Sequence, residues 1–361
     1  MRTVNGWAAK APGAALEPWR FERRDLRPTD VALRVTHAGV CFTDLDHVRP
    51  EPGQEQPDIF PLVPGHEMVG EVVAVGSEVT RFRVGDPVCV GNIVDSCGVC
   101  EACRGGDQQF CAEFPTLTYG GRDRHDGSLT QGGFADEYVA DQAFVYRRPE
   151  GLDPAGTAPL MCAGITTWVP LRRWEVGPGR TVGVVGLGGL GHIAVKLAKA
   201  LGAEVVGFTT SPGKAEGMRE LGADDVVVST DADAMDKQRG RFDFILDTVP
   251  RTHDLSPYLT ALRFDRTLCT LGMVSGMPFD PMSLMYGRKR LAAAGSGGIA
   301  DTQDMIDFCG THGVTATVEV LPVAEVNTAL DRLVAGDVTY RFVLDLGGSA
   351  GTAERRAASA T

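Results

Sequence analysis

Four of the nine cysteines in this 361-residue chain lie in one short stretch, as Cys97, Cys100, Cys103 and Cys111. Four thiolates on one loop can close a tetrahedron around Zn²⁺ and leave no coordination position for a substrate. The other interpretation, a group of free thiols in a glycine-rich loop, would leave reactive groups exposed. The spacing therefore predicts a structural zinc site.

Three further residues of metal-binding type come from separate segments: Cys41, His66 and Cys162. Two thiolates and one imidazole would give zinc three protein ligands and an open fourth position, which is the pattern of a catalytic zinc. Each of the three can also be an ordinary buried core residue, so spacing alone leaves both interpretations open. The polar residues that adjoin them in the sequence are Thr43, Asp44 and Glu67.

A glycine-rich turn with G-x-G-x-x-G spacing is the third candidate site. An apolar β-branched run, 181–185, precedes it, and a segment with helical apolar spacing, 192–202, follows. This context predicts a βαβ unit whose turn and helix N-terminus approach the pyrophosphate of a dinucleotide. The residues of the predicted turn are Gly186, Gly188, Gly189, Leu190 and Gly191.

The end of the next strand favours NADP(H) over NAD(H). The strand over 204–208 runs out without the acidic residue that holds the ribose 2′-hydroxyl in NAD sites. Hydroxyls and a lysine suit a dianionic 2′-phosphate instead. Ser211 could also cap the following helix, and the two roles are compatible. The predicted phosphate-binding residues are Thr209, Thr210, Ser211 and Lys214.

The overall composition excludes some classes of partner. Asp plus Glu number 47 against 35 Lys plus Arg, which gives a formal charge of −12. This acidity argues against a nucleic-acid partner or an anionic membrane surface. The chain begins without an apolar secretory segment and has no apolar run of membrane-spanning length. We therefore expect a cytoplasmic protein whose partners are small molecules.

The candidate sites need two kinds of scaffold to position them. Residues 1–151 are rich in β-branched runs punctuated by Gly, Pro and Asp, which predicts a compact, partly open β-barrel. Residues 152–300 alternate apolar strands with helical segments, which predicts a doubly wound parallel sheet flanked by helices. Residues 349–361 are expected to form a disordered tail.

These motifs, in this order, resemble the zinc-dependent medium-chain alcohol dehydrogenases. The segments that carry the likeness are 39–45, 64–67, 97–111, 160–166 and 186–192, with 209–214, 301–309 and 327–345 closer to the cinnamyl alcohol dehydrogenase branch. The likeness covers residues 6 to 346. It implies a GroES-like catalytic domain, 1–151 completed by 301–348, interrupted by a Rossmann NADP-binding domain, 152–300. It also implies substrate binding between the domains and a homodimer formed by edge-to-edge pairing of Rossmann sheets.

The resemblance assigns the catalytic zinc to Cys41, His66 and Cys162. Glu67 would be a nearby second carboxylate able to approach the metal. Asp44 would orient His66 through a hydrogen bond. The remaining contacts that the resemblance implies are those of Thr166 with the nicotinamide and of Arg341 with a cofactor phosphate.

The proton relay departs from the family pattern. Thr43 matches its hydroxyl, but the usual histidine five residues after the first ligand is here Asp46, with His47 beside it. Phe42 replaces the usual polar or basic residue. In an extended segment His47 would point away from Thr43, although a turn would bring it back.

The leading interpretation is NADP(H)-dependent interconversion of a primary alcohol, aromatic or medium-to-long aliphatic, and its aldehyde. Zinc would act as a Lewis acid on the substrate oxygen, and the nicotinamide would carry the hydride. Reduction of an activated C=C or iminium bond is an alternative. A non-catalytic NADPH-binding protein fits less well, because the catalytic set is intact. Four bulky apolar residues could shape a pocket for such an aldehyde, or could belong to the core: Phe42, Tyr119, Trp168 and Met273.

Overall fold

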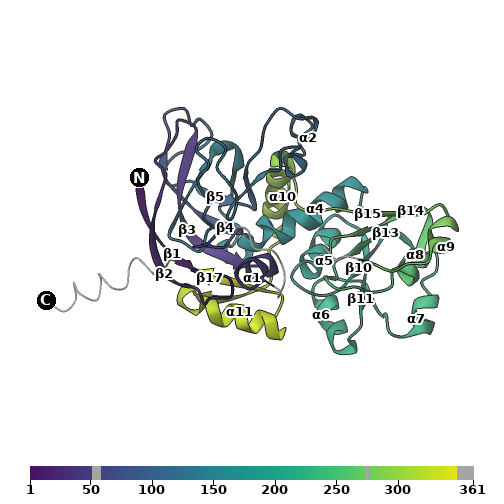
Figure 1. The fold of residues 1–361 in the computed structure, drawn as a ribbon. Coiled ribbons are helices and arrows are strands. Elements are labelled where there is room, and N and C mark those ends of the chain that lie inside the picture. The colour runs from purple at the N-terminus through teal and green to yellow at the C-terminus, as the bar shows by residue number, and fades with distance from the viewer. Residues whose placement is uncertain (51–57, 273–275, 348–361) are drawn as a thin grey trace. The chain divides into compact units, whose positions relative to one another are not determined.

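The computed structural model describes residues 1–50, 58–272 and 276–347, and the chain forms two compact units (Figure 1). Unit 1 is Met1–Cys162 together with the chain from Gly297 onward, and unit 2 is Ala163–Ser296. Within the described ranges, no helix is long and apolar enough to cross a membrane. The tail expected to be disordered, 349–361, lies outside the described residues, as does Met273.

Unit 2 is built on a six-stranded parallel sheet with the order β12-β11-β10-β13-β14-β15. β10 (Thr181–Val185) is buried at every position, as a β-branched strand covered on both faces should be. The order reverses between β10 and β13, and ligands bind at the carboxyl ends of strands at such a switch point. The predicted doubly wound sheet is confirmed.

The other elements of unit 2 are α4 (Ala163–Arg173), α5 (Gly191–Ala200), β11 (Glu204–Thr209), η4 (Pro212–Lys214), α6 (Ala215–Glu220), β12 (Asp225–Val228), α7 (Ala232–Asp236), β13 (Phe242–Asp247), α8 (Ser256–Ala261), β14 (Leu262–Thr270), α9 (Pro281–Met285) and β15 (Arg290–Ala293).

Unit 1 contains a seven-stranded sheet with the order β16-β17-β3-β4-β5-β9, in which β8 also pairs with β3. β3 (Asp30–Val40) pairs antiparallel with β4, β8 and β17. Because β16 and β17 lie after unit 2 in the sequence, the returning chain completes the sheet of unit 1. β1 and β2 form a separate two-stranded sheet, as do β6 and β7.

The other elements of unit 1 are β1 (Arg2–Ala8), β2 (Glu17–Arg23), α1 (Phe42–Val48), β4 (Met68–Val75), β5 (Pro87–Val90), β6 (Ile93–Asp95), α2 (Glu101–Arg104), η1 (Gln108–Phe110), β7 (Thr116–Leu117), β8 (Glu137–Asp141), η2 (Gln142–Phe144), β9 (Val145–Arg147), α3 (Pro154–Thr157), η3 (Ala158–Met161), α10 (Ile299–His312), β16 (Val318–Pro322), η5 (Val323–Glu325), α11 (Val326–Ala335) and β17 (Arg341–Asp345).

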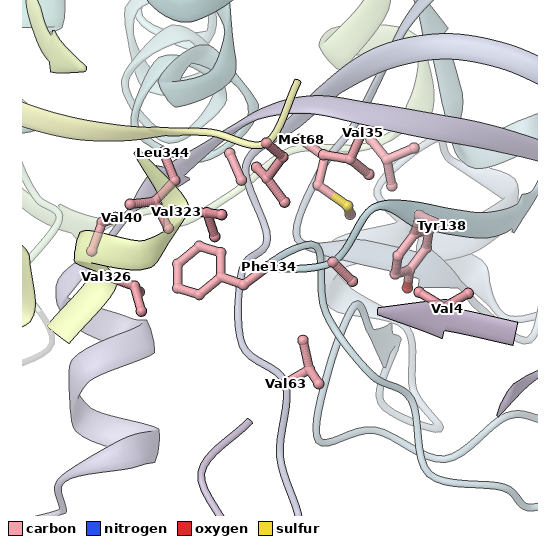
Figure 2. Packing of buried hydrophobic residues seen from close by; sticks show 14 of the residues in the cluster. Val4, Val35, Val40, Val63, Met68, Phe134, Tyr138, Val323, Val326 and Leu344 are labelled. Atoms are coloured by element: carbon pink, nitrogen blue, oxygen red, sulfur yellow. The ribbon is translucent and has the colours of Figure 1, made fainter. Parts of the chain in front are cut away.

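One hydrophobic core joins the first and last parts of unit 1. Figure 2 shows the ring of Phe134 directed toward Val323 and Val326, which belong to the returning chain. All three side chains are buried. Full burial of a side chain of this size contributes about 1.5–3 kcal/mol, so the returning chain is held by packing as well as by strand pairing.

The segment just before unit 2 packs on the sheet of unit 1. α3 and η3 contact β3, β4, β5 and β17. The four residues of η3 are all buried, which keeps the chain on unit 1 as far as Cys162. The domain boundary was expected after residue 151, which lies before this segment. By contacts between residues, the chain stays in unit 1 up to Cys162, and unit 2 begins at Ala163.

Candidate active site

Cys41 is held at the start of a short helix directly after β3. It occupies the N-cap of α1, where its N–H donates to Oδ2 of Asp44 (2.9 Å) and its carbonyl accepts from the N–H of Asp44 (3.1 Å). These reciprocal bonds satisfy backbone groups at the helix start that would otherwise lack partners. They also turn the Asp44 side chain inward, where it is fully buried.

The Asp44 carboxylate joins two of the segments that carry predicted ligands. Besides the N–H of Cys41, it accepts hydrogen bonds through Oδ1 from the N–H of Gly65 (2.9 Å) and from Nδ1 of His66 (3.0 Å). An imidazole held at Nδ1 by a carboxylate presents Nε2 as a metal ligand. Burial lowers the pKa of His66, but Asp44 and the Cys41 thiol outweigh it and hold that pKa well above the usual range.

The structure brings Cys41, His66, Glu67 and Cys162 together, with one ligand atom of each within 4.8 Å of the others. The contact with Cys162 and the charges of Arg341 and His66 lower the pKa of Cys41 well below its usual value. A low pKa favours the thiolate, which is the form that binds metals. Two sulfurs, an imidazole and a carboxylate are a donor set that suits zinc.

Glu67 provides an independent test of whether a cation fits here. It is fully buried, and burial raises its pKa to about 8. Among the described residues neither carboxylate oxygen accepts a hydrogen bond, although Oε1 lies 3.4 Å from Nη2 of Arg341. Buried carboxylate oxygens rarely stay unpaired. Their position beside the two thiols shows that the residues fit a zinc ion.

Arg341 lies at this cluster, inside unit 1. Its guanidinium is 4% exposed and faces Glu67, with Nη1 3.4 Å from the carbonyl of Val40. Nε and Nη2 have no hydrogen-bond partner in the part of the chain that the structure describes. The expected contact between Arg341 and a cofactor phosphate stays a prediction.

The predicted relay residues lie on α1, which is helical rather than extended. Oγ1 of Thr43 lies 3.7 Å from Sγ of Cys41, and Nδ1 of His47 lies 2.7 Å from the carbonyl of Thr43. Residues four apart share a helix face, so the helix brings His47 to the side of Thr43. Asp46 is exposed. Of the two geometries considered from the sequence, the structure has the turn and not the extended segment.

The four-cysteine cluster has the geometry of a closed zinc site. Sγ of Cys97 lies 3.9 Å from Sγ of Cys103, close to the ~3.8 Å expected between two sulfurs bound tetrahedrally at about 2.3 Å. Backbone N–H groups also donate to the sulfurs, as from Cys97 to Cys111 (3.3 Å). The N–H groups of Ala112 and Cys103 lower the pKa of Cys100 to about 6. The four sulfurs lie within 4.8 Å of one another, and this geometry fits a metal with thiolate ligands.

The predicted cofactor turn lies between β10 and α5 in unit 2. Gly186 has φ +91°, a conformation that favours glycine. A Cβ atom at Gly191 would lie 2.2 Å from the carbonyl oxygen of Gly186, whereas a Cβ at Gly188 would meet open space. Gly186 thus permits the tight turn, Gly188 leaves the backbone open to a ligand, and Gly191 permits close packing at the helix start. These are the three roles of glycine in a dinucleotide-binding turn. Gly189 and Leu190 complete the loop, and Leu190 is the N-cap of α5.

The loop after β11 keeps its polar groups at the end of the strand. Thr209 is buried, and its hydroxyl accepts the N–H of Ser211 (3.1 Å). Ser211 is the N-cap of η4, but its side chain makes no capping hydrogen bond. The capping role considered for Ser211 is therefore not observed. Thr210 and Lys214 are exposed.

Comparison with known proteins agrees with this geometry. A family model described as an alcohol dehydrogenase GroES-like domain matches residues 27–150, and one described as a zinc-binding dehydrogenase matches residues 189–311. The chain is 46% identical over 353 residues to a probable mannitol dehydrogenase of Fragaria ananassa, covering 96% of each chain.

Two solved structures are similar over nearly the whole chain. A cinnamyl alcohol dehydrogenase from Sorghum bicolor is 44% identical with a TM-score of 0.90, covering 96% of this chain and 98% of that one. The CAD of Helicobacter pylori, complexed with NADP(H), is 31% identical with a TM-score of 0.87, covering 96% and 99%.

The chain belongs to the zinc-dependent medium-chain alcohol dehydrogenases.

Within this family of oxidoreductases it falls in the cinnamyl alcohol dehydrogenase-like branch, and both the predicted family and the predicted fold class are confirmed. Unit 1 carries the GroES-like domain of an alcohol dehydrogenase, and unit 2 carries most of the zinc-binding dehydrogenase match.

Three other residues predicted for the cofactor or the substrate pocket of this alcohol dehydrogenase differ in burial and contacts. Oγ1 of Thr166 accepts the N–H of Ser296 (3.3 Å), where unit 2 ends, and a hydroxyl that accepts one hydrogen bond can still donate one. Trp168 is buried in α4, in agreement with the core interpretation. Phe42 is 49% exposed and follows Cys41, so its ring remains available to a ligand.

Two residues of the site were missed or undervalued in the sequence. A Cβ atom at Gly39 would lie 1.9 Å from Oε2 of Glu67, so only glycine leaves room for that carboxylate. Tyr119 was considered only for a pocket or the core, but its ring contacts the rings of both His47 and His66. No local sequence pattern predicts the space at Gly39 or the ring contacts of Tyr119, because both depend on contacts between distant segments.

For the closed cluster we expect Cys103→Ser to damage stability before activity. A serine hydroxyl is a poor replacement for a thiolate, and structural zinc contributes directly to folding free energy. The variant should lose about one zinc equivalent and melt several degrees lower. Metal analysis and calorimetry measure both effects.

The control for this prediction is Cys89→Ser, which changes a buried thiol outside both clusters and should leave the zinc content unchanged. An unchanged zinc content in Cys103→Ser would contradict a metal site at the four cysteines.

Proposed function

We propose that this chain is an NADP(H)-dependent alcohol dehydrogenase that interconverts a primary alcohol and its aldehyde. The observation that supports it most is the meeting of Cys41, His66 and Cys162 within 4.8 Å, with the hydroxyl of Thr43 next to the Cys41 thiol. Three protein ligands leave one position of a tetrahedral metal for a substrate.

The catalytic zinc would be held by Cys41, His66 and Cys162, with Glu67 as the additional carboxylate. When bound there, zinc supplies a Lewis acid for the substrate oxygen. Asp44 fixes the orientation of His66 through its hydrogen bond to Nδ1. A second zinc would be held by the four cysteines 97, 100, 103 and 111, which leave no position for substrate.

The cofactor would bind to unit 2 at the turn between β10 and α5. Thr210 and Lys214 are exposed, and the hydroxyl of Ser211 makes no capping hydrogen bond. These groups suit the 2′-phosphate of NADP(H). The relative from Helicobacter pylori that is complexed with NADP(H) supports this choice. Thr166 and Arg341 would contact the nicotinamide and a phosphate, and the hydride chemistry belongs to the cofactor.

The substrate would be an aromatic or medium-to-long aliphatic aldehyde. The half-exposed ring of Phe42, directly after Cys41, favours an apolar substrate over a sugar alcohol. The names of the relatives differ on this point, because one is a probable mannitol dehydrogenase and another a cinnamyl alcohol dehydrogenase. We also propose a homodimer that pairs two copies at an edge strand of the parallel sheet, which size measurement in solution would test.

A panel of aldehydes assayed for NADPH consumption tests the proposed activity. We expect aromatic and medium-chain aldehydes to be reduced, the matching alcohols to be oxidised with NADP⁺, and mannitol to react poorly. Reduction of activated C=C bonds without aldehyde turnover would refute the proposal. NADPH binding with no turnover of any substrate would also refute it.

For the cofactor, we expect the unmodified protein to prefer NADPH, and Thr209→Asp to reverse this. An aspartate at the end of β11 would repel the 2′-phosphate and offer an acceptor to a free 2′-hydroxyl. Loss of one or two charge-assisted hydrogen bonds should raise the KM for NADPH about 10–100-fold. Steady-state kinetics with both cofactors measure the change.

The matched control is Thr209→Asn, which has similar size without the charge and should keep most of the NADPH preference. If the unmodified protein already uses NADH better, the interpretation of this loop is wrong.

A further inference from the structure

Tyr119 is buried between two imidazoles of unit 1. It is 4% exposed and packs with Ile59 and Leu62. Its ring meets that of His47 edge-on, with centroids 5.3 Å apart at 88°, and lies tilted against that of His66, 5.8 Å away at 47°. The aromatic ring therefore fixes one side of a predicted metal ligand.

The hydroxyl of Tyr119 is not needed for this packing. It makes no hydrogen bond with any of the residues that the structure describes. Buried hydroxyls in native proteins almost always have a partner, and phenylalanine would fill the same space without a polar atom. The hydroxyl therefore indicates a hydrogen bond that forms when the site is loaded.

Asp44 is the acceptor that we assign to it, because Asp44 binds Nδ1 of the same His66 ring that Tyr119 contacts. A carboxylate can accept about four hydrogen bonds. Asp44 accepts two at Oδ1, from Gly65 and His66, and one at Oδ2, from Cys41, so Oδ2 has room for another donor. A tyrosine hydroxyl carries its proton at neutral pH and can therefore act as the donor.

We propose that the Tyr119 hydroxyl donates the fourth hydrogen bond to Asp44 and thereby holds His66 in the orientation that binds the catalytic metal. This rests on the proposed function only in taking His66 as a zinc ligand. Tyr119 is then a positioning residue, because it acts on the metal through Asp44 and His66.

The test is Tyr119→Phe in the zinc-loaded enzyme, with zinc release to a chromogenic chelator measured in the absence of substrate. Removing a partner behind a ligating histidine typically weakens metal binding 10–100-fold, so we expect one zinc to leave about tenfold faster. The second zinc, at the four cysteines, should leave at an unchanged rate. We also expect a lower kcat with an almost unchanged KM for the aldehyde.

Two further variants make the result specific. Tyr146→Phe changes another buried tyrosine of unit 1, on β9, and should leave both release rates unchanged. In a double-mutant cycle, Tyr119→Phe should add little to zinc release once Asp44→Asn is present, because both changes then break the same chain of contacts.

Three outcomes would overturn the proposal. They are an unchanged release rate in Tyr119→Phe, an effect equal to that of Tyr146→Phe, and a rise in aldehyde KM alone, which would place the hydroxyl on the substrate. Because zinc release is measured without turnover, these results are separate from a failure of the proposed function, which would appear as a zinc-loaded enzyme that reduces no aldehyde.

Discussion

Replacing Cys162 with alanine is expected to abolish aldehyde reduction while leaving most of the fold intact. The change removes one of the two sulfurs that meet His66 at the site, and Cys41 and His66, even with the Glu67 carboxylate nearby, should not retain a catalytic metal. Electrostatic and Lewis-acid stabilisation of a developing oxyanion is worth several kcal/mol, so kcat should fall by at least about 10³-fold. The structure should persist, because the preceding helix η3 is held by four buried residues.

Zinc analysis and calorimetry complete this test. Cys162→Ala should contain one zinc equivalent in place of two and melt close to the unmodified protein, in contrast to Cys103→Ser. Full activity in a protein with a single zinc per chain would refute the two-site account.

Thr43→Val is expected to have the second-largest effect. Valine keeps the shape of threonine but removes the hydroxyl that lies 3.7 Å from Sγ of Cys41. When an alcohol is oxidised its hydroxyl proton must leave, and positioned proton transfer typically contributes 10²–10⁴-fold. We therefore expect alcohol oxidation to slow by about 10²-fold or more.

His47→Gln should be much milder, within about tenfold, if water or Asp46 can take the proton from Thr43. Nδ1 of His47 is already held by the backbone carbonyl of Thr43 and is not available to its hydroxyl. Comparing the pH dependence of kcat for the two variants, with Asp46→Asn as a control, distinguishes the routes. A loss in His47→Gln as deep as that in Thr43→Val would mean that His47 carries the relay.

The parallel sheet was predictable because buried parallel strands appear in the sequence as short, continuous runs of apolar residues. β10 was expected at Thr181–Val185 and is found there, and the strand expected over 204–208 is found as β11, Glu204–Thr209. Both are short apolar runs of β-branched residues between turns, which suits strands covered on both faces. The four-cysteine cluster was predictable from its spacing. The grouping of Cys41, His66 and Cys162 came from the family resemblance instead, because each of the three could also be a core residue, and the structure brings their ligand atoms within 4.8 Å.

What the sequence could not reveal depends on contacts between distant segments. The helix that carries Thr43 begins at a cysteine, a poor capping residue, and is stabilised by Asp44, which is itself fixed by Gly65 and His66. The burial of Arg341 against Glu67 has the same origin, because the two residues are brought together only by the pairing of β17 with β3.

The pairing of β3 with β17 also sets the order in which this protein can be made. Val40 pairs with Phe342, so the central strand of unit 1 stays open on one side until nearly the whole polypeptide has left the ribosome. Unit 2 uses one continuous stretch of chain and can fold earlier. Closing so distant a pair is slow, and until it closes Cys41 follows a strand that has no partner on that side. We therefore expect Cys41, which is buried in the folded protein, to be more open to oxidation during synthesis than afterwards.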